Sequence, residues 1–233
     1  MRGFPGAVLS KAYGVMRRVR NGVAVTLLMA GAAVAEPVTV VALGDSLTAG
    51  YGLADPATGL VPQLEGWLKA RGHDVVVQNA GVSGDTTAGG LARIGWALGP
   101  EADALIVTLG GNDLLRGIDP AASKANLEGI LKEAAARKLP VLLVAMKAPG
   151  NFGPEYKAAF DAMYGDLSAA YGTLLADDFF GGLRAAGADP ADPASMAAFL
   201  QADGLHPNPE GVKLIFEGLG PKVEALLDRV PPS

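Results

Sequence analysis

Few side chains in this sequence could form a catalytic centre. Ser46 stands in the run Gly44–Leu47 (GDSL), directly after a short apolar stretch, and its hydroxyl would need a base to act as a nucleophile. The chain has no cysteine and only two histidines, His73 and His206. His206 follows Asp203 by three residues, so the carboxylate can accept the Nδ1–H of the ring and leave Nε2 to take a proton from a serine. These residues predict a Ser46–His206–Asp203 triad.

Other polar residues have competing roles. Ser83 also lies in a glycine-rich turn, but it directly precedes an expected helix, and turn or capping duties account for it. His73 comes just after an expected helix, and a favourable position near that helix end is a sufficient structural role. A metal site built on Asp203 and His206 would need a third protein ligand, and the sequence offers no further histidine for it. We therefore expect no metal and no cofactor.

Three backbone or amide N–H groups are candidates for an oxyanion hole. Ser46 can contribute its own N–H, Gly81 permits a close backbone approach in the next loop, and Asn112 carries an amide donor after Gly-Gly. Each segment by itself also fits ordinary turn or capping chemistry, and Ser46 alone could cap a short helix. Their convergence at the ends of successive strands favours the catalytic interpretation.

The hydrophobic pattern predicts one α/β domain over residues 36–233. Apolar runs predict a central parallel sheet of about five strands, at 37–43, 74–78, 104–109, 141–146 and 173–176. Helical periodicity lies between them, at 60–70, 86–98, 121–138, 155–171 and 208–229, with Asn208 as N-cap and Pro209 at the first helical position. We expect residues 181–192 to be an irregular surface connection. The alternation predicts a three-layer α/β/α sandwich with its site beyond the carboxyl ends of the strands.

Residues 1–35 resemble a secretory signal peptide. Basic residues precede the apolar run Val23–Ala35, which is too short to span a bilayer, and Ala33–Ala35 matches the small-x-small cleavage pattern. We expect cleavage before Glu36, with Met16 as an alternative start. The protein is then periplasmic or secreted and has no membrane span after cleavage. A buried N-terminal helix or an uncleaved anchor is the competing interpretation.

Charge excludes one class of partner. All five basic residues of the first 35 positions lie in the proposed signal peptide, and without them 14 basic residues face 24 acidic ones, a net charge of −10. An acidic surface repels polyphosphates, so we expect no nucleic-acid partner.

The ordered motifs resemble the SGNH/GDSL hydrolase family. The resemblance rests on Gly-Asp-Ser-Leu at 44–47, Asn-Ala-Gly-x-Ser-Gly at 79–84, Gly-Gly-Asn-Asp at 110–113 and Asp-Gly-x-His-Pro at 203–207. Further similarity to the bacterial periplasmic acyl-CoA thioesterase/lysophospholipase/arylesterase group lies at 47–53, 83–87, 89–93 and 115–117. The resemblance covers nearly all of the expected mature chain, and it implies a flavodoxin-like SGNH hydrolase fold.

The resemblance also implies site roles and a reaction. Ser46 would be the nucleophile, Asp203 and His206 would complete the triad, and Ser46, Gly81 and Asn112 would form the oxyanion hole. A mobile loop shaping the acyl pocket is implied at Asp113, Leu114, Leu115, Arg116 and Gly117, with another wall at 147–154 that includes Phe152. The implied substrate is a small-molecule ester or thioester. A carbohydrate O-acetylesterase or acyltransferase, or a non-catalytic lipid- or glycan-binding protein, are the alternatives.

Overall fold

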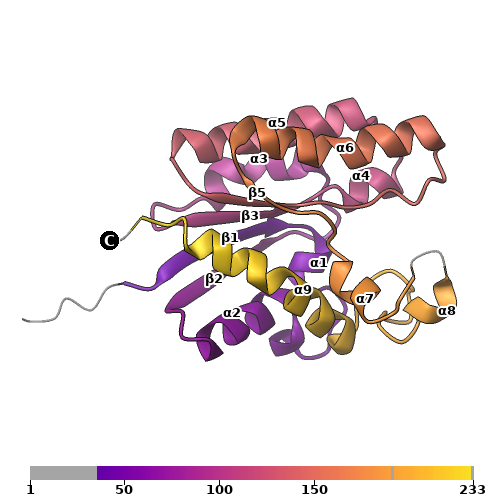
Figure 1. Cartoon of the computed structure of the whole chain (residues 1–233), viewed down its shortest axis with the longest axis horizontal. Coiled ribbons are helices and arrows are strands. Elements are labelled where there is room, and N and C mark those ends of the chain that lie inside the picture. The colour runs from indigo at the N-terminus through magenta and orange to yellow at the C-terminus, as the bar shows by residue number, and fades with distance from the viewer. Residues whose placement is uncertain (1–35, 190–191, 232–233) are drawn as a thin grey trace, which may run out of the picture. The chain divides into compact units, whose positions relative to one another are not determined.

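A five-stranded parallel sheet forms the centre of the protein, as a computed structural model of the chain shows (Figure 1). The structure describes residues 36–189 and 192–231. The strand order is β2-β1-β3-β4-β5, and every neighbouring pair is parallel. The strands are β1 (Val38–Gly44), β2 (Val75–Gly81), β3 (Ala104–Thr108), β4 (Val141–Val144) and β5 (Leu174–Ala176).

Helices cover both faces of this sheet (Figure 1). One layer holds α3 (Thr87–Ala97), α5 (Pro120–Ala136) and α6 (Pro154–Tyr171), and the other holds α2 (Leu60–Ala70) and α9 (Pro209–Leu227). The strand order 2-1-3-4-5 is that of flavodoxin-like doubly wound folds. The expected three-layer α/β/α sandwich is therefore confirmed.

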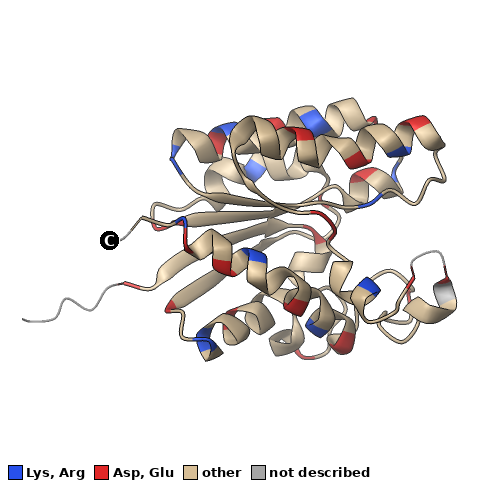
Figure 2. Cartoon of the chain, in the orientation of Figure 1, with Lys and Arg blue, Asp and Glu red and all other residues tan. Residues whose placement is uncertain are grey.

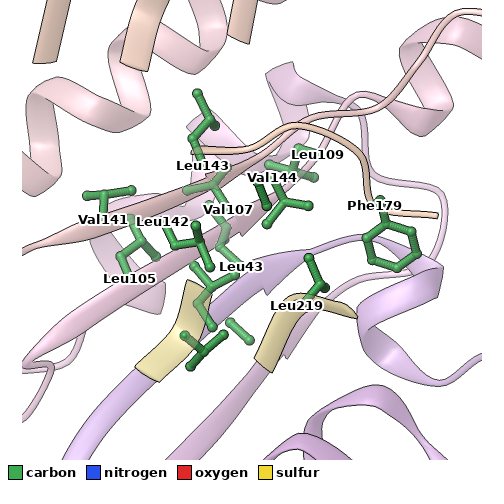
Figure 3. Packing of buried hydrophobic residues seen from close by; sticks show 14 of the residues in the cluster. Leu43, Leu105, Val107, Leu109, Val141, Leu142, Leu143, Val144, Phe179 and Leu219 are labelled. Atoms are coloured by element: carbon green, nitrogen blue, oxygen red, sulfur yellow. The ribbon is translucent and has the colours of Figure 1, made fainter. Parts of the chain in front are cut away.

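The sheet is apolar because both of its faces are buried. Leu43, Leu105 and Leu143 lie on three adjacent strands and are fully buried (Figure 3). Lysine, arginine, aspartate and glutamate lie mostly on the helices and loops, while the strands carry almost none (Figure 2). Burial of these apolar strands, each fully enclosed leucine contributing about 2 kcal/mol, holds the strand ends in fixed positions.

Asn208 and Pro209 act at the start of α9 as the sequence predicts. The Asn208 side chain accepts a hydrogen bond from the N–H of Gly211, and Pro209 occupies the first turn, where no intrahelical donor is needed. The chain just before α9 is thereby fixed, and it carries His206.

The expectation of an irregular connection at 181–192 is wrong in its first part. Residues Gly181–Ala185 form the short helix α7, and Leu183 within it is fully buried. A Cβ atom on Gly182 would collide with the backbone carbonyl of Leu214 in α9. The glycines there allow two helices to pack closely. From the local sequence alone, such glycines look the same as those of a flexible turn.

Three further short helices complete the part of the chain that the structure describes: α1 (Ser46–Ala49), α4 (Gly111–Leu115) and α8 (Pro193–Met196), together with a 3₁₀ turn, η1 (Pro56–Thr58). Within residues 36–189 and 192–231, no helix has the length and apolar character that crossing a bilayer demands. The predicted signal peptide, residues 1–35, lies outside the described residues.

Candidate active site

Four loops meet at the carboxyl edge of the sheet and bring the predicted polar residues together. Ser46 follows β1, Gly84 follows β2, Asn112 follows β3, and His206 lies in the segment that leads into α9. All four residues line one cleft. Parallel strands place their carboxyl ends at the same edge, so residues distant in sequence converge there.

Ser46, His206 and Asp203 form a continuous hydrogen-bonded chain. The Ser46 Oγ lies 2.8 Å from His206 Nε2, and His206 Nδ1 lies 2.7 Å from Asp203 Oδ2. The backbone N–H groups of Leu205 and His206 also donate to Asp203 Oδ1, at 2.9 and 3.0 Å. The hydrogen bond from His206 and these two backbone donors hold the pKa of Asp203 below its usual range, at about 2. Asp203 is therefore a carboxylate at neutral pH, and Nδ1 of His206 carries a proton towards it.

The His206 loop is braced from outside the triad. The Tyr51 ring lies 4.7 Å from the His206 ring, centroid to centroid. Gln201 joins the two loops, because its Nε2 donates to the Tyr51 carbonyl and to the Pro207 carbonyl, at 2.8 and 2.9 Å. The imidazole side chain is only 13% exposed, so these contacts leave it little freedom to rotate.

Ser46 is the first residue of α1 and Asp45 is the cap. The Asp45 Oδ1 accepts the N–H of Leu47 at 3.0 Å, which fixes the turn from strand to helix. Among the described residues, the Ser46 N–H has no hydrogen-bond partner. The serine therefore presents a hydroxyl and a free N–H at the cleft.

Asp45 also holds the third loop. It is 2% exposed, and its Oδ2 accepts a hydrogen bond of 3.3 Å from Asn112 Nδ2. Burial raises the pKa of Asp45 to about 6, with the Leu47 N–H, the Asn112 amide and His206 opposing that rise. One amide hydrogen of Asn112 is thus taken by Asp45, and the other is free to face the cleft.

Gly81 does not fit its predicted role as an oxyanion donor. Its N–H donates to Asn79 Oδ1 at 2.9 Å, and Asn79 Nδ2 donates to the Thr48 carbonyl at 3.1 Å. A Cβ atom on Gly81 would meet the Ala49 N–H and the Asp45 carbonyl. Gly81 is a glycine because β2 packs directly against the backbone of α1, and the cleft does not include it.

Gly84 occupies the place that the sequence assigned to Gly81. It lines the cleft beside Ser83, and its N–H has no partner among the described residues. Its φ of +85° is a left-handed conformation that favours glycine. The sequence signal was present in Ser83-Gly84-Asp85, but the prediction chose Gly81, the other glycine of this segment.

Only part of the predicted acyl-pocket segment reaches the cleft. Leu114 and Leu115 line it, whereas Asp113 is fully buried and faces away. The Asp113 carboxylate accepts hydrogen bonds from the Thr87 N–H, the Thr87 hydroxyl and the Ser123 hydroxyl, at 2.6 to 2.8 Å. The prediction that Asp113 contacts substrate is therefore wrong: it anchors α4 to α3 and α5.

Arg116, Gly117 and Phe152 also lie outside the cleft lining. Arg116 donates to the Gly84 carbonyl at 2.8 Å, which ties the α4 loop to the second loop. The Phe152 ring packs 5.0 Å from the Tyr156 ring and against the backbone of Gly117. These three residues shape the loops behind the cleft and do not form its surface.

The cleft has a volume of about 1080 Å³ and a mostly apolar lining. Its apolar walls are Leu47, Leu114, Leu115, Pro149, Phe180, Met196, Ala197, Leu200, Ala202 and Leu205. Two cationic side chains, Lys147 and Arg184, also line it; Arg184 is paired with Asp178, while Lys147 has no ion-pair partner among the described residues. Lys147, Pro149 and Asn151, from the segment 147–154, also line the cleft.

His73, the second histidine, lies away from the cleft. His73 Nε2 lies 3.1 Å from Glu224 Oε1, on the face of α2 and α9. The capping role that the sequence suggested for Ser83 belongs to Thr86, whose side chain accepts the Gly89 N–H at the start of α3. Ser83 lines the cleft, but His206 Nε2 is directed at Ser46. Within residues 36–189 and 192–231, no cluster of three or more side chains suited to a metal ion occurs.

The sequence matches one known family over most of its length. Residues 42–214 match the model of the GDSL-like Lipase/Acylhydrolase family. The esterase TesA of Pseudomonas aeruginosa is 38% identical over 81% of this chain and 89% of its own length. Thioesterase 1/protease 1/lysophospholipase L1 of Escherichia coli K12 is 31% identical over 82% of this chain and 85% of its own.

Solved structures of related enzymes have the same architecture. The SGNH-hydrolase family esterase AlinE4 has a TM-score of 0.65 at 41% identity, covering 84% of this chain and 98% of its own. A crystal structure of TesA has a TM-score of 0.71 at 36% identity, covering 81% of this chain and 99% of its own.

Proposed function

This chain belongs to the GDSL-like lipase/acylhydrolase family and is an esterase of the SGNH type, and we propose that it acts through an acyl-enzyme on Ser46. The observation that carries the proposal is the hydrogen-bonded chain from Ser46 Oγ through His206 to Asp203, with links of 2.8 and 2.7 Å. These distances are those of a nucleophile, a base and an orienting acid in contact.

The first half of the reaction transfers the acyl group to the enzyme. His206 Nε2 takes the Ser46 hydroxyl proton as Oγ bonds to the carbonyl carbon of the substrate. The bond from that carbon to the leaving oxygen or sulfur then breaks, and His206 returns the proton to the leaving group. Asp203 keeps Nδ1 protonated and stabilises the imidazolium that forms between these steps.

The second half releases the acid. Water attacks the acyl carbon while His206 takes one of its protons, the carbon–Oγ bond breaks, and Ser46 recovers its proton from the histidine. Every proton that moves is held by His206 at Nε2, so the cycle needs no other acid or base.

The oxyanion hole that we propose consists of the N–H groups of Ser46 and Gly84 and the Asn112 amide. All three residues line the cleft, and none of the three donors is fully used by other groups of the described protein. Each well-aimed donor stabilises the tetrahedral intermediate by about 3 kcal/mol. Gly84 here replaces Gly81, whose N–H is occupied by Asn79.

The substrate class that we propose is an ester or thioester with an apolar acyl chain. The names of the relatives include arylesterase, thioesterase and lysophospholipase, and most of the surface of the cleft beside Ser46 is apolar, with leucine, methionine, phenylalanine, proline and alanine side chains. A carbohydrate O-acetylesterase would need polar groups to hold sugar hydroxyls, and the polar side chains of this lining cover less of its surface than the apolar ones. The apolar chemistry therefore favours acyl chains over sugar acetates.

We also propose that the protein acts in the periplasm or outside the cell. The support is in the sequence alone: a basic stretch, an apolar run and Ala33–Ala35 precede the catalytic domain.

Replacing the nucleophile tests the proposed function. Ser46→Ala should lower kcat on p-nitrophenyl esters from acetyl to palmitoyl by at least about 10⁴-fold, because the acyl-enzyme can no longer form. Over the same panel, wild-type KM should fall as the acyl chain lengthens, since each added CH₂ that enters the apolar cleft contributes up to about 0.8 kcal/mol.

The second serine of the cleft provides the matched control. Ser83→Ala should still be labelled by a fluorophosphonate probe at Ser46, whereas Ser46→Ala should carry no label. Turnover or labelling that survives in Ser46→Ala and disappears in Ser83→Ala would show that the nucleophile has been misassigned.

A further inference from the structure

Arg93 in α3 connects the two loops that flank the cleft. Its Nε donates to Asp85 Oδ2 at 2.6 Å, its Nη1 to the Ala80 carbonyl at 2.8 Å, and its Nη2 to the Gly44 carbonyl at 2.8 Å. The arginine side chain is 17% exposed and that of Asp85 is 18% exposed. One guanidinium thus holds a carboxylate and two carbonyl oxygens that belong to different strands.

These three acceptors adjoin the proposed oxyanion donors. Gly44 is two residues before Ser46, and Asp85 directly follows Gly84. Ala80 is the penultimate residue of β2, at the entry to the Gly84 loop. A shift of the Arg93 side chain would therefore move both the Ser46 loop and the Gly84 loop.

The sheet itself cannot fix this separation. The pairing of β1 with β2 ends at Gly44 and Gly81, and beyond it the chains diverge into α1 and the Gly84 loop. One backbone bond crosses the divergence, from the Val82 N–H to the Gly44 carbonyl at 3.0 Å. Arg93 adds a second donor to that same carbonyl and extends the link to Asp85.

We propose that Arg93 is a positioning residue for the oxyanion hole, which fixes the distance between the Ser46 and Gly84 N–H groups. This inference rests on the proposed function. Arg93 itself does not line the cleft. Its charge is balanced by Asp85, so it acts through alignment rather than through its electric field.

The chemistry of guanidinium explains why an arginine occupies this site. Its donors lie in one rigid plane, so three acceptors in different directions are held at fixed relative positions. A lysine ammonium keeps the charge but carries its three donors on one atom, so it cannot hold the three acceptors at the same relative positions. Misalignment of a reacting group by about 1 Å can reduce the rate by about 100-fold.

The test compares two arginines that each donate to two backbone carbonyls. Arg93→Lys should lower kcat on p-nitrophenyl butyrate by about 30- to 100-fold while KM stays within about threefold, because ground-state binding does not use the oxyanion hole. The rate constant for phosphonylation of Ser46 by a fluorophosphonate should fall by a similar factor, since that reaction also passes through an oxyanion.

Arg137 provides the control. It bridges the carbonyls of Leu98 and Gly95 at the other end of α3, away from the four loops. Arg137→Lys should lower the melting temperature while leaving kcat and phosphonylation within about twofold of wild type. Equal kcat losses in the two variants, or a loss in Arg93→Lys confined to KM, would overturn the proposal.

A second variant separates a folding defect from a loss of catalytic alignment. If Arg93→Lys is not folded at the assay temperature, Asp85→Asn takes its place, because it weakens only the Nε contact. A folded Asp85→Asn should lose kcat by about 3- to 10-fold at nearly constant KM, and unchanged kcat would contradict the inference. Activity in Ser46→Ala would refute the proposed function, whereas an inactive Ser46→Ala beside a fully active Arg93→Lys would refute only the role of Arg93.

Discussion

Asp45 has the most unusual environment among the polar residues at the site. It is 2% exposed, it caps α1, and it holds the Asn112 amide through a contact of 3.3 Å. Burial raises its pKa from the ordinary value of 3.8 to about 6. The two oxygens of the Asp45 carboxylate align Leu47 and Asn112. Burial removes the water that would otherwise solvate this carboxylate.

The raised pKa of Asp45 predicts a specific pH dependence of stability. Between about pH 4 and pH 6 the folded protein binds more protons at Asp45 than the unfolded chain does, so the free energy of unfolding should fall as pH rises through this window. Because a tenfold change in proton affinity is about 1.4 kcal/mol, this carboxyl should account for about 3 kcal/mol. Asp45→Asn should remove that decline, as measured by urea unfolding at successive pH values.

Asp203 gives the matching control, since its pKa moves in the other direction. With a folded pKa of about 2, it contributes stability above about pH 4 that is lost as pH falls towards 2. Asp203→Asn should therefore lower the free energy of unfolding by the same amount at every pH above about 4, and it should change the slope of the curve only below about pH 4. A decline from pH 4 to pH 6 that is as steep in Asp45→Asn as in wild type would rule out the buried carboxyl as its source.

At the scale of elements, the turn from β1 into α1 determines where Ser46 points. Thr48 Oγ1 lies 2.6 Å from Thr108 Oγ1, and both hydroxyls are buried against Gly44. A Cβ atom on Gly44 would collide with both of them. The glycine is therefore required by the packing of α1 on β3, and this packing holds the strand-to-helix turn in place.

Adding a single methyl group tests this packing. Gly44→Ala should destabilise the protein by about 1–3 kcal/mol and lower kcat, because α1 must move to admit the Cβ atom. Gly66→Ala in α2 is the control: its Cβ would meet nothing within 4 Å, and alanine there should stabilise by about 0.5–1 kcal/mol. Thermal unfolding and esterase assays of both variants measure the effect, and equal stabilities would contradict the collision at Gly44.

At the scale of the whole molecule, the chain carries opposite charge in its two parts. The first 35 residues hold five basic and no acidic residues, whereas residues 36–233 have a net charge of −10. The chain has no cysteine, so no disulfide contributes to the stability of the catalytic domain in any compartment. Basic and apolar residues before an acidic domain fit the export that we propose.

Export predicts a defined N-terminus. When the full chain is produced in a Gram-negative bacterium, the protein recovered from the periplasm should begin at Glu36, by intact-mass and N-terminal peptide analysis. Ala35→Gln is expected to block cleavage, because the position before the cut requires a small side chain. Recovery of a periplasmic protein that begins at Met1 or Met16 would exclude the signal-peptide proposal.

The sequence by itself predicted the fold class and identified Ser46, His206 and Asp203. Apolar strands, helical periodicity and caps such as Asn208 are local properties, and they determine the alternation of elements without reference to distant contacts. The triad could be inferred because only two histidines are present and one of them stands three residues from an acid. The tertiary structure then placed these three side chains in one hydrogen-bonded chain.

The tertiary structure alone decided which backbone donors and which side chains face the cleft. Asn79 takes the Gly81 N–H while its own amide is held by the Thr48 carbonyl 31 positions away, and α3 and α5 draw Asp113 into the interior, so contacts with distant segments contribute to the failure of both predicted roles. The role inferred for Arg93 could not be predicted from the sequence either, because its acceptors lie up to 49 positions away in the chain. Residue type and spacing determine what a side chain can do, but hydrogen bonds between distant segments determine which groups remain free to do it.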